Sequence, residues 1–177
     1  AWTGFKNITD TAVANVDFNT GGSVTGALVS TTPTGTLNYA TYAAPVNYKL
    51  GGAALSTGIT GTNTGFTTIT GNANSNTITG TGATYLLAAA TPDAGSSGGQ
   101  AWTNFKNITD TTGTANFQAS GSLTGNLSAQ TLNYSTYTQD LTLNASTGAI
   151  TNNGVTGTLT LNGTKTVNAN SGQNNSV

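Results

Sequence analysis

The sequence predicts an all-β protein, built as a right-handed parallel β-solenoid (β-helix) of short strands stacked on one another. Three observations predict this fold: an internal repeat, short segments in which apolar and hydroxyl residues alternate, and turns rich in glycine and asparagine. No segment has a convincing amphipathic helical period. A two-sheet β-sandwich is the alternative, because it is also made of short strands joined by polar turns.

The repeat is clearest in two decamers, residues 1–10 and 101–110, which differ only where Gly4 stands opposite Asn104. We therefore expect one continuous solenoid block over residues 1–177, made of two related copies at about 1–95 and 101–177. Further matches follow each decamer: residues 22–28 with 121–127, 36–42 with 131–137, and 46–50 with 141–145.

Short alternating segments are the expected strands: residues 67–70, 76–79 and 157–161. A period of two places one set of apolar side chains on a single face, namely Ile69, Ile78, Leu159 and Leu161. Residues 85–90 are the one helix candidate, which we interpret as a buried strand or a bulge. Solenoid repeats are typically short, so we expect coils of about 20–25 residues and about seven to nine coils. Asparagine-rich turns such as residues 71–75 are expected to stack into amide ladders.

Composition excludes several classes of protein. Only 5% of residues are charged and the net charge is −1, so the chain offers no basic surface for nucleic acid. The absence of cysteine excludes disulfides and thiolate sites. No apolar run approaches the length of a membrane span, and no signal peptide is recognisable. Because the sequence starts inside a repeat motif, we expect a mature product or part of a longer chain. A neutral surface of hydroxyls and amides favours self-association.

Catalytic candidates are scarce. Histidine and cysteine are absent, so the usual nucleophile–base pairs are excluded. Glycoside hydrolysis needs two carboxylates, but Asp10 and Asp110 occupy equivalent places in the two decamers, which indicates a structural turn role. Asp17 is matched by Asn116 in the second copy. We therefore predict no enzymatic activity, no catalytic or metal-ligating residue and no cofactor.

Aromatic residues are the remaining candidates for a binding site. The tryptophans of the decamers favour a core role over sugar binding, whereas the tyrosines fit an outward row for sugars and an internal stacked ladder equally well. The candidate adhesive or stacking residues are Trp2, Tyr39, Tyr42, Trp102, Tyr134 and Tyr137.

The decamers, residues 36–42 and residues 71–80 resemble repeat regions of very large secreted bacterial surface proteins. These are adhesins of the filamentous-haemagglutinin and autotransporter-passenger kind, together with haemolysin-type repeats. The resemblance implies a solenoid fold and an extracellular location, at the bacterial cell surface or in a secreted matrix. Haemolysin-type calcium repeats carry aspartate where this chain has Asn74 and Asn76, so no calcium site is expected.

These observations predict a non-catalytic structural protein that forms a cell-surface stalk, fibre or self-assembling filament. Its partner would be another copy of itself or further repeats of a longer chain. The alternative is an adhesin module that binds glycans or host matrix through its aromatic faces. Ice binding is less favoured and would rest on ranks of outward threonine in residues 60–64, 77–81 and 156–160.

Overall fold

The structure, a computed structural model, describes every residue except 1–5, 13–14, 33, 53–55 and 89–90. The described residues form β-strands and one short 3₁₀ turn, η1 (Leu50–Gly52), with no α-helix among them. This confirms the all-β prediction. The chain divides into two compact units: unit 1 comprises Ala1–Gly80 and Ser97–Phe105, and unit 2 comprises Thr81–Ser96 and Lys106–Val177. The chain passes between the units after Gly80, Ser96 and Phe105, and the last of these points lies inside the second decamer. The units therefore do not coincide with the sequence copies.

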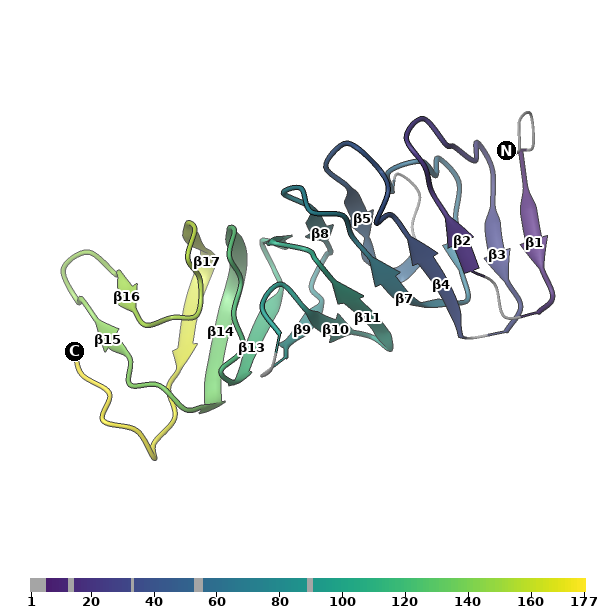
Figure 1. The fold of residues 1–177 in the computed structure, drawn as a ribbon. Coiled ribbons are helices and arrows are strands. Elements are labelled where there is room, and N and C mark those ends of the chain that lie inside the picture. Colours follow the sequence, from purple (N-terminus) through teal and green to yellow (C-terminus); the bar gives the residue numbers. More distant parts are fainter. Residues whose placement is uncertain (1–5, 13–14, 33, 53–55, 89–90) are drawn as a thin grey trace. The chain divides into compact units, whose positions relative to one another are not determined.

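In unit 1 the strands pair in three parallel sets: β1–β3–β6, β2–β4–β7–β11 and β5–β8. Figure 1 shows β2, β4, β7 and β11 side by side. These strands are β1 (Ile8–Asp10), β2 (Asn15–Asp17), β3 (Leu28–Ser30), β4 (Gly35–Asn38), β5 (Asn47–Lys49), β6 (Asn63–Thr64), β7 (Phe66–Thr70), β8 (Thr77–Thr79) and β11 (Gln100–Thr103). Within each set the strands lie in the order in which they follow one another along the chain.

Unit 2 contains a similar parallel set, β9–β13–β14–β17, with β12 also paired to β14. Two antiparallel pairs, β10 with β9 and β15 with β16, make the pairing mixed. The strands are β9 (Thr84–Leu87), β10 (Gly95–Ser97), β12 (Asn107–Thr109), β13 (Thr114–Ala119), β14 (Leu127–Tyr137), β15 (Thr142–Leu143), β16 (Ile150–Thr151) and β17 (Leu159–Asn168).

The spacing between stacked strands is not uniform. Ile8 pairs with Leu28, 20 residues later, but Leu28 pairs with Asn63, 35 residues later. Other parallel pairs fall in the same two groups, separated by 17–21 or by 30–35 residues. The expected spacing of about 20–25 residues is therefore wrong for the pairs separated by 30–35 residues. Long connections with their own turns, such as the segment containing η1, account for the larger spacing.

The predicted strands at residues 67–70 and 76–79 are confirmed as β7 and β8, and Ile69 and Ile78 are fully buried. Residues 157–161 mark only the start of β17, where Leu159 and Leu161 are half-buried. The helix candidate begins with β9, in which Tyr85 and Leu87 are buried; its residues 89–90 lie outside the described part. Alternation therefore identified the inward face correctly.

Candidate functional site

The structure places most of the predicted aromatic residues inside the protein. Tyr39, Tyr134 and Trp102 are at most 1% exposed, and Tyr137 is 5% exposed. Tyr42 is half-buried, and Trp2 lies outside the described residues. The outward aromatic row considered for sugar binding is therefore not formed by the described tyrosines. The two-residue period of a β-strand is a sequence signal for this burial. Tyr39 and Tyr134 each lie two residues after an inward leucine, Leu37 or Leu132.

These rings form the same internal stack in each unit. Phe18 stacks on Tyr39 with centroids 5.0 Å apart, and Phe117 stacks on Tyr134 at 4.6 Å. Each tyrosine hydroxyl donates a 2.9 Å hydrogen bond to a backbone carbonyl, that of Thr57 or Asn153 respectively. Burial raises the pKa of both tyrosines far above the ordinary value. The stacks are repeated core elements of the fold.

Tyr48 is a further buried aromatic residue that the sequence analysis did not single out. Its hydroxyl donates to Asn63 Oδ1 at 2.7 Å and accepts from Gln100 Nε2 at 2.8 Å. Burial raises its pKa to about 12, although the hydrogen bond from Gln100 acts in the opposite direction. Tyr48 shares the parity of the buried Val46, a signal that was present in the sequence.

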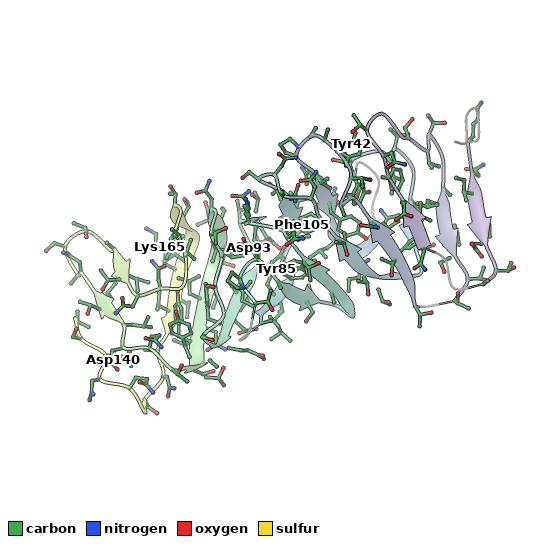
Figure 2. All side chains as sticks on the ribbon, viewed as in Figure 1. Tyr42, Tyr85, Asp93, Phe105, Asp140 and Lys165 are labelled. Atoms are coloured by element: carbon green, nitrogen blue, oxygen red, sulfur yellow. The ribbon has the colours of Figure 1, made fainter. Side chains whose placement is uncertain are left out.

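Among the described carboxylates, Asp110 accepts the largest number of hydrogen bonds. It is 2% exposed and accepts hydrogen bonds from the N–H groups of Gly82 and Ala83 and from the Tyr85 hydroxyl, at 2.8–3.0 Å. The Thr112 N–H adds a further bond of 3.1 Å. Burial opposes ionisation, but these donors outweigh it and hold the pKa of Asp110 below its ordinary value. Figure 2 labels Tyr85, whose hydroxyl is one of these donors. Asp110 thus ties the start of unit 2 to β12.

The other described carboxylates also bond to the surrounding fold. Asp93 accepts from the N–H and hydroxyl of Thr124 at 2.7 and 2.6 Å, and Asp17 Oδ1 accepts from Asn38 Nδ2 at 2.7 Å. In the described ranges, no cluster of three or more His, Cys, Asp or Glu side chains could hold a metal ion. An open hollow of about 330 Å³ lies along residues 150–156 beside Ser122, lined by neutral side chains.

Asn76 lies at the end of an asparagine-rich turn, immediately before β8. It is fully buried, its Oδ1 accepts from the Val46 N–H at 2.9 Å, and its Nδ2 donates to the carbonyls of Asn72 and Asn104 at 2.8 and 2.7 Å. The amide therefore supplies donors as well as an acceptor, which a carboxylate does not. Asn175 repeats two of these bonds in unit 2, with Leu141 and Asn170.

Outward residues of unit 2 form ranks across the parallel strands. Thr84, Thr114, Thr131 and Thr166 are successive register partners in β9, β13, β14 and β17. A second rank contains Asn116, Asn133 and Asn168, in which Asn133 Nδ2 donates to Asn116 Oδ1 at 2.8 Å. The threonine tract at residues 77–81 does not continue such a rank across the neighbouring strand, because Thr77 and Thr79 pair with Asn47 and Lys49.

Comparison of the chain with protein-family models, with curated proteins and with solved structures gives no significant match. The resemblance to secreted bacterial surface proteins therefore stays a prediction. Within the part of the chain that the structure describes, no helix is long and apolar enough to cross a membrane.

Proposed function

We propose that this chain is a non-catalytic structural protein of the extracellular space, which forms a stalk, fibre or self-assembling filament. In this proposal the two units are right-handed parallel β-solenoids, as the repeat led us to expect. The observation that carries the proposal is the in-register stacking of parallel strands, for example Leu37 with Ile69 and Ile69 with Trp102.

Parallel stacking suits a structural role because each added strand satisfies the backbone groups of the one before it. In unit 1 one inward residue follows another along the stack: Val16, Leu37, Ile69 and Trp102. Right-handed crossovers are the general rule for parallel connections, which supports the proposed handedness.

The outer face supports assembly with neutral partners. Its ranks consist of hydroxyls and amides, and the whole chain has four basic and five acidic residues. Little charge repulsion opposes the approach of another copy. The location at a bacterial surface or in a secreted matrix remains part of the proposal and rests on the repeat pattern.

Electron microscopy of the purified chain over a range of concentrations tests the structural role. The proposal predicts narrow rods or regular filaments in the absence of any ligand. Compact, rounded particles at every concentration would contradict it.

Ice binding is a second candidate, favoured by the threonine rank of unit 2. Neighbouring strands place these hydroxyls about 4.8 Å apart, in a regular row. A measurement of thermal hysteresis tests it: a freezing-point gap that is lost on replacing Thr131 with valine supports the candidate, and no gap contradicts it. Glycan adhesion through the aromatic residues has no comparable support, because Tyr39, Tyr134 and Trp102 are buried.

A further inference from the structure

Asparagine followed by any residue except proline and then by serine or threonine forms a sequon, the acceptor sequence for N-glycosylation. The chain contains seven sequons, which begin at Asn7, Asn107, Asn126, Asn133, Asn144, Asn162 and Asn174. In a chain so rich in asparagine and threonine, most of these matches are expected by chance. The structure separates them, because a transferase needs access to the asparagine amide and to the hydroxyl two residues later.

Five of the seven sequons are part of paired β-strands. Asn7 and Asn126 directly precede β1 and β14, and the other three asparagines lie inside β12, β14 and β17, namely Asn107, Asn133 and Asn162. Two of these amides bond to a neighbouring strand: Asn133 Nδ2 donates to Asn116 Oδ1 at 2.8 Å, and Asn162 Nδ2 donates to Ser128 Oγ at 2.7 Å. In an extended strand the first and third residues of a sequon are about 6.6–6.8 Å apart, so the amide and the hydroxyl do not come together. The fold therefore disfavours transfer at these five sequons.

The sequon at Asn174 lies outside the strands, but its hydroxyl is already used. Ser176 Oγ donates to Thr142 Oγ1 at 3.0 Å, and the Ser176 N–H donates to the Leu141 carbonyl at 2.9 Å. At the other end of the sequon, the Asn174 N–H donates to Asp140 Oδ1 at 2.9 Å. This segment is therefore held along residues 140–142, which disfavours its entry into the active site of a transferase.

Asn144 lies in the turn between the antiparallel strands β15 and β16, which Figure 1 shows side by side. Every residue of this turn, 144–149, is exposed. Asn144 Oδ1 accepts hydrogen bonds from the N–H groups of Ser146 and Thr147, both at 3.0 Å. The chain thus folds back so that the asparagine side chain lies close to the third residue of its sequon. Among the described residues, neither Asn144 Nδ2 nor Ser146 Oγ has a hydrogen-bond partner.

We propose that Asn144 is an N-glycosylation site, which receives an oligosaccharide from a polyprenyl diphosphate carrier. Asn144 Nδ2 forms a bond to the anomeric carbon of the first sugar, the bond between this carbon and the diphosphate oxygen breaks, and the polyprenyl diphosphate leaves. The amide proton passes to a base of the transferase. A bulky hydrophilic group at this turn adds solubility to a surface with little charge. The inference rests on the extracellular location proposed above, because this modification is typical of secreted proteins.

Transfer in vitro to the folded, full-length chain tests the site directly. The purified chain is incubated with an oligosaccharyltransferase and an oligosaccharide linked to polyprenyl diphosphate, and mass spectrometry of the glycopeptides locates the sugar. The folded chain should gain one glycan, at Asn144. Two short peptides that carry the Asn133 and Asn144 sequons, each with serine in the third place, serve as controls. Both peptides should be glycosylated, because in the chain it is the fold that distinguishes the two sequons.

Two serine variants form a matched pair, since each removes the hydroxyl of one sequon at an exposed residue. Ser146→Ala should abolish transfer but keep the turn, because the turn uses the N–H of this residue and not its hydroxyl. Ser135→Ala removes the sequon of Asn133 and should leave transfer unchanged. Ser146→Thr, which restores a hydroxyl, should retain the glycan. Circular dichroism and thermal unfolding of all three variants should match the parent.

An unmodified folded chain, under conditions in which both peptides are glycosylated, would overturn the proposed site. The same holds for transfer that survives Ser146→Ala, or for a folded chain that carries as much glycan at Asn133 as at Asn144. Rods or filaments in electron micrographs together with any of these results would leave the structural role standing and remove only the glycosylation site. Rounded particles at every concentration, from a chain that is modified at Asn144, would contradict the structural role alone.

Discussion

The ring of Phe117 lies almost parallel to that of Tyr134, with the planes inclined by 16° and the centroids 4.6 Å apart. Tyr137 packs against both rings in an edge-on arrangement. Its ring centroid lies 6.0 Å from that of Phe117 and 5.3 Å from that of Tyr134. Phe18, Tyr39 and Tyr42 build a related cluster in unit 1. Because the cluster is repeated and its stacked rings are buried, these aromatic residues stabilise the core of each unit.

Replacing Phe117 with alanine should lower the free energy of unfolding by about 3–5 kcal/mol, because the ring is fully buried and leaves a cavity. Denaturant titration followed by circular dichroism measures the loss. Leu86→Ala is the control, since this side chain is 39% exposed and should cost less than about 1 kcal/mol. Equal losses in the two variants would show that the stack is not part of the core.

Replacing Gly125 with alanine should destabilise the protein by about 1–3 kcal/mol. A Cβ at this residue would overlap Asn107 Oδ1 and would lie 2.7 Å from the Lys106 carbonyl oxygen. The same overlap occurs at Gly26 with Asn7, so Gly26→Ala should behave alike. Thermal unfolding compares these variants with Gly172→Ala, where the nearest atom is 3.3 Å away. A Gly125→Ala protein as stable as Gly172→Ala would refute the close approach.

Asp110 should make the protein sensitive to acid. Its folded pKa lies below the ordinary value of 3.8, so ionised Asp110 stabilises the fold at neutral pH. This stabilisation is lost as the pH falls below about 4 and through the lower folded pKa. Unfolding free energies measured from neutral to acid pH should show the loss. Asp110→Asn should be less stable than the parent at neutral pH, and its free energy of unfolding should fall less steeply as the pH is lowered. Equal pH dependence of the two proteins would contradict this role of Asp110.

Tyr48 should make the protein sensitive to alkali. Its pKa is raised from 10.0 to about 12, so the folded state holds the phenolic proton more tightly than the unfolded chain does. Stability is therefore complete below about pH 10 and falls as the pH rises through 12. The buried Tyr39, Tyr85 and Tyr134 act in the same direction. Ionisation of these four buried tyrosines, followed by tyrosinate absorbance, should accompany unfolding; their ionisation near pH 10 in a folded protein would disagree.

Sequence reasoning identified those elements that depend on local pattern. Alternation of apolar and hydroxyl residues located β7 and β8, and it placed Ile69 and Ile78 inside. The same rule applied to Leu37 and Tyr39 would have placed the tyrosine inside as well. The equivalence of Asp10 and Asp110 indicated a turn role, and each accepts an N–H bond from the residue two places later.

Other features depend on contacts between distant residues and were not accessible from local patterns. The 35-residue spacing of Leu28 and Asn63 depends on loop lengths, which change the chain length between stacked strands at little cost in free energy. The bonds of Asp110 with Gly82 and Ala83 span 28 and 27 residues, and no local pattern links these segments. The pairing of Thr131 with Thr166 likewise joins residues that are far apart in the sequence.

The most direct measurement of the central claim is nuclear magnetic resonance of the isotope-labelled chain, read for contacts between backbone protons of stacked strands. Parallel stacking should give cross-peaks that join Leu37 to Ile69, Ile69 to Trp102, and Leu132 to Val167. Cross-peaks of antiparallel hairpins between sequence neighbours at these residues, as in a sandwich of two sheets, would contradict it.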